Sequence, residues 1–240
     1  MKHTALHVIR ALKAHASPKK ARASERFFKT GKGEYGEGDV FWGVTMPETR
    51  AVVKKFLGLS LGEIRQLIRS RVHEHRMAGF LLLISRYKDD SEQTYDEYLK
   101  NIRHVNNWDL VDVTCEHVVG AWCFLKKDTR PLLRLARSKK LWERRIAIIS
   151  TFAFLKKGDD NPTYTLADIL LFDEEDLMHK AVGWMLREAG KRVDEASLRK
   201  YLNKHALTMP RTTLRYAIER LPKAVQKAYL RGDIRGTLKQ

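Results

Sequence analysis

The sequence predicts an all-α protein in which helix pairs stack into a curved α-solenoid, and three observations favour this class. Only 6 prolines occur in 240 residues, and long stretches carry apolar residues at every third or fourth position. Helical segments of similar pattern recur with a period near 35 residues. Because one helix pair cannot bury its apolar face alone, successive pairs stack. We therefore expect one domain over residues 1–240, whose 43% hydrophobic residues build a core without disulfides.

The first 54 residues are predicted to form helices on either side of a glycine-rich loop. Residues 5–14 place apolar and basic side chains on different helix faces, and Pro18 is typical of the first turn of the next helix, which carries Phe27. Four of the 14 glycines fall within residues 31–39, the glycine-rich segment. Because glycine disfavours helix, this segment predicts an ordered loop or a short β-hairpin, after which residues 47–54 form a helix.

From about residue 60 onward, a basic residue followed by an apolar run recurs in four predicted helices. The first two are 69 residues apart, about two periods, and the next two offsets are 35 each. Residues 108–112 occupy the slot in between and are predicted helical with a different pattern. This period predicts HEAT-like repeats with a stripe of cations along one, concave, side. The four basic residues are Arg76, Arg145, Lys180 and Arg215.

The net charge favours a polyanionic partner. The chain has 46 Lys and Arg against 29 Asp and Glu, which gives +17 and a pI near 9.9. Residues 126–157 hold eleven basic and two acidic residues, and such clustering on predicted helices is typical of a nucleic-acid interface. A curved stripe of cations suits a duplex backbone better than a small ligand, so we expect a basic concave DNA-binding groove. The alternative is a basic surface that only keeps the protein soluble.

Other function classes are disfavoured by what the sequence lacks. No apolar stretch approaches the roughly 20 residues of a membrane span, and the first residues do not resemble a secretory signal, so we expect a cytoplasmic protein with no membrane partner. Cys115 and Cys123 stand outside any Cys/His ladder, so we expect two buried reduced thiols and no zinc. The glycine-rich segment lacks the Gly-Lys-Ser/Thr end of a Walker loop, which disfavours a nucleotide site.

The most unusual segment for chemistry combines asparagine, tryptophan and aspartate. Asn106 or Asn107 is suited to cap a helix, and Trp108 and Asp112 then lie one turn apart on one face. A carboxylate beside an indole in a basic protein is suited to stabilising a developing positive charge. The alternatives are core packing for Trp108 and a salt bridge for Asp112, whereas the helix dipole accounts for Asp109.

A second tryptophan follows a glycine inside a predicted helix. Gly183 costs roughly 1 kcal/mol there relative to alanine, which predicts close packing or the approach of a ligand. Trp184 comes next, with core packing as its alternative role. Arg187 lies three residues further on and shares the face of Trp184.

Four segments together resemble the bacterial DNA alkylation repair glycosylases of the AlkD type. Three are NWDLVD from Asn107, WERRIAI from Trp142 and KAVGWMLRE from Lys180, whose order and separations also match. The fourth, FWGVTMPETR from Phe41, resembles the start of the first repeats in that family. The likeness spans roughly residues 5–220. Each segment alone would be weak evidence for this family, but the four segments together are specific to it.

The resemblance implies a HEAT-like solenoid that clasps duplex DNA and cleaves the N-glycosidic bond of positively charged N3- and N7-alkylated purines. By the same resemblance, Asp112 would be the catalytic carboxylate, and Trp108 and Trp184 would flank the deoxyribose of the lesion. Arg145 and Arg187 would hold the DNA backbone. The family acts without a base-flipping pocket, metal or cofactor. We expect a monomer whose partner is double-stranded DNA with alkylated bases, and which joins the nucleoid when bound.

Two features depart from the family pattern. The family has a tyrosine on the second helix that contributes to the lesion site, whereas Phe27 at the best-matching position lacks the hydroxyl. The glycine-rich segment looks like an insertion, and some relatives with an added hairpin bind branched DNA with weak or no glycosylase activity. A non-catalytic binder of branched or damaged DNA is therefore the second hypothesis. A protein-interaction solenoid is the third, and the charge of +17 argues against it.

Overall fold

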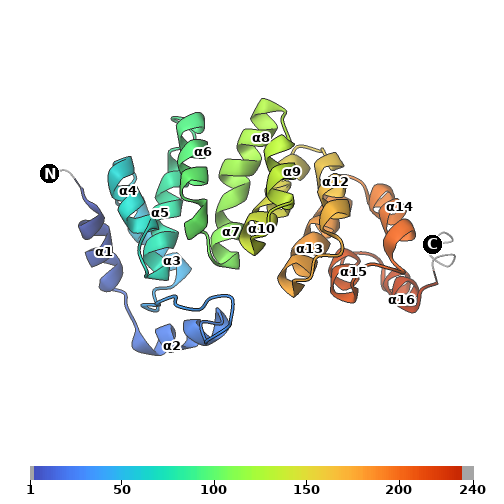
Figure 1. Ribbon diagram of the computed structural model, residues 1–240, viewed down its shortest axis with the longest axis horizontal. Coiled ribbons are helices and arrows are strands. Elements are labelled where there is room, and N and C mark those ends of the chain that lie inside the picture. Colours follow the sequence, from blue (N-terminus) through green and yellow to red (C-terminus); the bar gives the residue numbers. More distant parts are fainter. Residues whose placement is uncertain (1–2, 234–240) are drawn as a thin grey trace. The chain divides into compact units, whose positions relative to one another are not determined.

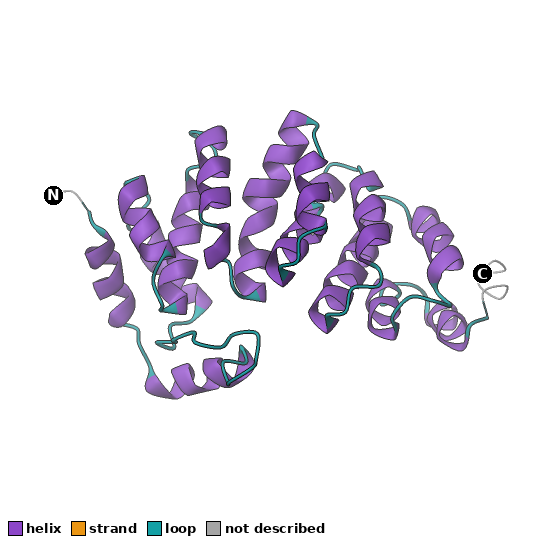
Figure 2. Cartoon of the chain, in the orientation of Figure 1, coloured by secondary structure: helices purple, strands orange, loops and turns teal. Residues whose placement is uncertain are grey.

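The computed structural model describes residues 3–233, and this range consists of helices and loops (Figures 1 and 2). No β-strand occurs within it, and extended pairing is limited to an isolated parallel bridge between Val40 and Val72. The predicted all-α class is therefore confirmed. The glycine-rich segment forms successive turns and not the β-hairpin that was one of its two predicted forms. None of the helices in residues 3–233 is long and apolar enough to cross a lipid bilayer.

The chain divides into two compact units, Met1–Thr114 and Cys115–Gln240, which are described one at a time. Unit 1 is built around α5 (His73–Ser85). Every residue of α5 from His73 to Leu83 is buried, because α1, α3, α4 and α6 all pack on it. The helices of unit 1 are α1 (Ala5–Lys13), α2 (Pro18–Phe27), α3 (Met46–Lys54), α4 (Leu61–Ile68), α5, α6 (Ser91–Lys100), the 3₁₀ turn η1 (Ile102–His104) and α7 (Trp108–Cys115), whose last residue begins unit 2.

A buried carboxylate fixes the chain between the glycine-rich segment and α3. The Oε1 atom of Glu74 accepts hydrogen bonds from the backbone N–H groups of Trp42 (3.0 Å), Gly43 (2.8 Å) and Val44 (3.2 Å). Gly43 has φ 74°, and a Cβ there would lie 2.3 Å from the carbonyl oxygen of Ser17, so no other residue fits. Residues 41–44 therefore connect the start of α2 to α5 through these contacts.

Unit 2 is built around its longest helix, α13 (Asp176–Arg192). α13 packs against α10, α11, α12, α14 and α15, and its residues Met178, Ala181 and Val182 are among the most buried of the unit. The other elements are the π-helical turn η2 (Glu116–Gly120), α8 (Ala121–Lys126), α9 (Arg130–Ala136), α10 (Leu141–Ser150), α11 (Phe152–Leu155), α12 (Asn161–Leu170), α14 (Glu195–His205), α15 (Arg211–Ala217) and α16 (Lys223–Arg231).

The predicted period is present in the helices themselves. Five helices start 33 to 35 residues apart along the chain, and the slot that lacked the basic pattern is one of them. The starting residues are His73 for α5, Trp108 for α7, Leu141 for α10, Asp176 for α13 and Arg211 for α15.

Two further predictions about packing are confirmed in unit 2. A Cβ on Gly183 would lie 2.5 Å from the carbonyl oxygen of Thr213 and 2.6 Å from Cβ of Tyr216, so this glycine lets α13 approach α15 closely. Cys115 and Cys123 are both buried, and neither forms a disulfide.

Candidate functional site

Trp108 and Asp112 lie on the first turns of α7, as the sequence predicts. The side-chain oxygen of Asn107 accepts a hydrogen bond of 2.8 Å from the backbone N–H of Trp108 and so stabilises the start of the helix. Trp108 and Asp112 are one helical turn apart, and both are half-buried. An indole and a carboxylate therefore share a helix face that is partly open to solvent.

Aromatic side chains pack against the indole ring of Trp108. Phe28 stacks on the indole with ring centroids 5.3 Å apart and an interplanar angle of 24°. Phe28 also stacks on Phe41 at 5.0 Å and on His73 at 5.2 Å, and these four rings form what we call the aromatic stack. Phe27, which the sequence placed near the lesion, meets Trp108 edge-on at 5.6 Å and is 64% exposed. Phe28 and Phe41 were not among the predicted site residues.

A buried charged cluster holds the stack and the start of α7 together. Asp39 accepts from Arg76 at 2.7 Å, from Asn106 at 2.7 Å and from His73 Nδ1 at 3.4 Å. The other ring nitrogen of His73, Nε2, lies 2.8 Å from a carboxylate oxygen of Asp109. Because both ring nitrogens face carboxylates, the imidazole carries two protons and a positive charge. Asp109 is thus an ion-pair partner, a role that the helix-dipole interpretation missed.

The pKa values of this cluster follow from its geometry. Burial by itself would lower the pKa of His73, but its hydrogen bonds to Asp109 and Asp39 outweigh burial and raise the pKa to about 9. Burial would likewise raise the pKa of Asp39, yet the hydrogen bond from His73 and the charge of Arg76 hold this pKa below its ordinary value. Both groups are therefore charged at neutral pH.

We expect the free energy of unfolding to decrease as the pH rises from 6.5 to about 9. His73 has an ordinary pKa of 6.5 and a folded pKa of about 9, so its contribution is complete below 6.5 and is lost as the pH rises through 9. The shift corresponds to about 3 kcal/mol. Urea unfolding over this interval tests the prediction, and His73→Gln should remove most of the pH dependence. His75 does not titrate there, because burial and Arg76 lower its pKa to about 4. Equal pH dependence in both proteins would contradict the assignment.

The glycine-rich segment is folded against the same region. The backbone N–H of Gly36 donates to the carbonyl of Lys29 at 2.9 Å, and a Cβ on Gly36 would lie 2.4 Å from the carbonyl oxygen of Phe28. Asp39, the last residue of the segment, reaches Asn106 at the approach to α7. The segment is therefore anchored at its middle and at its end, next to the support of Trp108.

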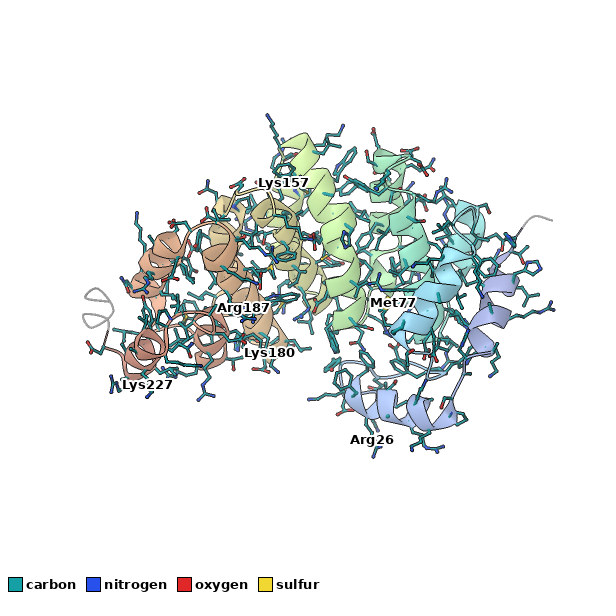
Figure 3. The ribbon with its side chains drawn as sticks, turned by 180° about the vertical axis from the view of Figure 1, so that it is seen from behind. Arg26, Met77, Lys157, Lys180, Arg187 and Lys227 are labelled. Carbon is teal, nitrogen blue, oxygen red and sulfur yellow. The ribbon has the colours of Figure 1, made fainter. Side chains whose placement is uncertain are left out.

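Trp184, Arg187 and Lys180 lie along α13 in unit 2, and Figure 3 labels Arg187 and Lys180. Trp184 is half-buried, with its ring 6.3 Å from that of Phe152. Lys180 pairs with Asp176 at 2.6 Å. Arg187 pairs with Glu219 and, at 3.1 Å, with Glu188. These carboxylates offset the two positive charges in the free protein.

The predicted stripe of four cations is not uniformly at the surface. Arg76 is 4% exposed and pairs with Asp39, and Arg145 is 5% exposed and donates to the carbonyl of Leu177 at 2.6 Å. Arg215 is exposed, and Lys180 is half-buried. Contact of Arg76 or Arg145 with DNA would require the guanidinium to leave these partners. Two of the four positions thus serve the packing of their units.

The basic residues of positions 126–157 are mostly at the surface. Nine of the eleven are exposed, and the exceptions are Arg144, which pairs with Asp173 at 2.6 Å, and Arg145. Figure 3 shows Lys157 at the upper edge of unit 2 and Lys180 at its lower edge. Lys157 and Lys180 therefore lie at different edges of unit 2.

The comparisons with known proteins agree with this arrangement of helices. The family model described as "DNA alkylation repair enzyme" matches residues 8–221. The chain belongs to this family. Among solved structures, a predicted DNA alkylation repair enzyme from Enterococcus faecalis superposes with a TM-score of 0.71 at 19% identity, over 88% of this chain and 98% of the other. A search of curated proteins gave no match. Among residues 3–233, no group of three or more His, Cys, Asp or Glu is arranged to hold a metal ion.

Proposed function

We propose that this member of the DNA alkylation repair family is a glycosylase that excises positively charged N3- and N7-alkylated purines from duplex DNA. The observation that carries the proposal is the pair of half-buried side chains Trp108 and Asp112 on one face of α7, with Trp108 held by the aromatic stack. A rigid indole beside a carboxylate provides two groups that act on the same developing charge.

The chemistry of an alkylated purine matches these two groups. Alkylation at N3 or N7 makes the base cationic, so the base leaves without protonation by the protein. As the glycosidic bond breaks, positive charge develops on the sugar, and the carboxylate of Asp112 stabilises this charge and orients the attacking water. An indole face attracts the same charge more strongly in the transition state than in the ground state. The proposed reaction uses no metal, no cofactor and no base-flipping pocket.

The remaining roles are divided between the two units. Trp108 and Trp184 are proposed to flank the deoxyribose of the lesion, with Phe27 at the DNA surface beside Trp108. Arg187, Lys180 and Arg215 are proposed to contact DNA phosphates, which compete for the first two cations with their carboxylate partners. Arg145 and Arg76 are also proposed to contact phosphates, on the condition that each guanidinium leaves its buried partner.

Base release from methylated duplex DNA tests this function. We expect the wild-type protein to release 3-methyladenine and 7-methylguanine, both from cationic nucleosides, and to leave O6-methylguanine and unmodified bases in place. Mass spectrometry of the released bases gives the measurement, with the same DNA without protein as the control for spontaneous loss. Release no greater than in that control would contradict the glycosylase.

The second candidate is a non-catalytic binder of branched or damaged DNA. It is favoured by Phe27, which has no hydroxyl, and by the glycine-rich segment, which is exposed at Lys32 and Gly33 and lies beside the support of Trp108. Under this hypothesis a four-way junction is bound more tightly than a linear duplex of the same length, and no base is released. Measuring both affinities in parallel with base release distinguishes the two candidates.

A further inference from the structure

The last helix of the described chain, α16, carries a basic face that the family match does not include. The match ends at residue 221, and α16 runs from Lys223 to Arg231. Lys223, Lys227 and Arg231 follow one another at intervals of four residues, so they lie on one side of the helix, and all three are exposed. Arg220, just before the helix, is exposed as well.

These four cations have no carboxylate partner within residues 115–233. Among residues 115–233, ion pairs hold Lys180 and Arg187 on α13 and Arg199 on α14, whereas none involves the four. The nearest polar contact is between Lys223 and the side-chain oxygen of Gln226 at 3.4 Å. Their positive charge is therefore available to an external anion at no cost of breaking an ion pair.

The opposite side of α16 is fixed to the unit. Val225, Ala228 and Tyr229 are buried, and the hydroxyl of Tyr229 lies 2.7 Å from the side-chain oxygen of Asn203. Arg211 donates to the carbonyl of Leu230 at 2.8 Å near the end of the helix. Because the apolar face is already used inside the protein, α16 has no apolar face to insert into a lipid surface. The exposed face also lacks the aromatic or aliphatic anchors typical of a protein interface.

We propose that the exposed face of α16, with Arg220, is an additional contact surface for the phosphate backbone of the DNA substrate. The inference rests on the proposed function, which makes DNA the partner. From Lys223 to Arg231 the helix rises about 12 Å, which corresponds to roughly three to four phosphates of one strand. Figure 3 shows Lys227 of α16 and Lys180 of α13 along the lower edge of unit 2, so this surface extends the edge on which Lys180 lies.

The salt dependence of DNA binding tests the proposal. The variant Lys223→Gln/Lys227→Gln/Arg231→Gln removes three charges while it keeps good helix formers. Each lost phosphate contact lowers the slope of log K against log salt by ~0.9, so the slope for a short undamaged duplex should fall by ~2–3 between roughly 50 and 200 mM salt. Fluorescence anisotropy on the full chain gives the slope for both proteins.

A matched control removes the same number of charges from helices other than α16. Lys191→Gln/Lys200→Gln/Lys204→Gln affects three exposed lysines at the end of α13 and on α14, none of which belongs to α16. We expect its slope to equal that of the wild type. An unchanged slope in the α16 variant, or an equal fall in both variants, would overturn the proposal. The proposal would also be overturned if the α16 variant lost binding to anionic phosphatidylserine vesicles while its DNA binding stayed equal to that of the wild type.

The failure of this inference differs from the failure of the proposed function. If the wild type binds DNA with a steep salt dependence and releases alkylated bases while the α16 variant matches it, only the α16 surface is refuted. If the wild type shows a flat salt response and releases no base, both the proposed glycosylase function and the α16 surface are refuted.

Discussion

Asp112→Asn is expected to lower the rate of 7-methylguanine release by ~100- to 1,000-fold while leaving affinity for undamaged duplex within a factor of two or so. The substitution keeps the shape of the side chain and removes the negative charge that stabilises the oxocarbenium-like sugar. A loss of this size corresponds to about 3–4 kcal/mol of transition-state stabilisation. Because undamaged DNA develops no such charge, its binding depends little on Asp112.

Single-turnover base release and anisotropy on the same protein preparation measure the two effects separately. Asp89→Asn is the matched control, since Asp89 is an exposed carboxylate of unit 1 outside the candidate site. We expect it to match the wild type in both assays. If Asp112→Asn weakened DNA binding as much as base release, or lowered the melting temperature strongly, Asp112 would be a structural residue.

Asp39→Ala is expected to destabilise the protein by ~3–5 kcal/mol, which lowers the melting temperature by roughly 6–20 °C. Asp39 is the partner of three donors, and its removal leaves the 4%-exposed Arg76 without its carboxylate and the buried His73 with Asp109 alone. Because Asp39 also holds Asn106 near the start of α7, base release should fall together with stability.

Thermal unfolding of Asp39→Ala and of the exposed control Asp89→Ala measures this effect. The control is expected to stay within ~0.5 kcal/mol of the wild type, as surface substitutions usually do. A change in Asp39→Ala no larger than in the control would show that the charged cluster does not stabilise unit 1. Asp39→Asn keeps the size of the side chain and should recover part of the loss through its bond with Asn106.

The helices and their period could be predicted because both depend on local patterns of residues in the sequence. Apolar residues at helical spacing and the prolines at positions 18 and 47 set both ends of the first and third helices, and the start of the second, to within a residue or two. The 35-residue period located the start of α7 even though that helix lacks the basic residue of the others. Each of these signals acts over one or two turns and needs no knowledge of distant residues.

The candidate site was only partly predictable, because its support depends on pairs that are distant in sequence. Trp108 and Asp112 were found from their spacing, and Phe27 from the resemblance to the family. The link between His73 and Asp109 joins residues 36 apart, and the link between His73 and Asp39 joins residues 34 apart. One signal was present: a separation of 36 is close to one repeat, and stacked repeats bring equivalent positions together.

The basic stripe shows a further limit of reasoning from residue type. Arg76 and Arg145 occupy equivalent places in the pattern and were expected to face DNA, yet both guanidinium groups are buried with partners of their own units. A sequence gives the charge of a side chain but not the carboxylate or carbonyl that reaches it from another helix. Burial of a paired arginine depends on that partner.

The most direct test of the central claim is the rate at which the wild-type protein, in excess, releases 7-methylguanine from a duplex with a single N7-methylguanine. The account predicts a rate well above spontaneous loss from the same duplex, and this excess should disappear in Asp112→Asn. Release at the spontaneous rate by the wild type, in a preparation that still binds DNA, would contradict the glycosylase and favour the non-catalytic binder.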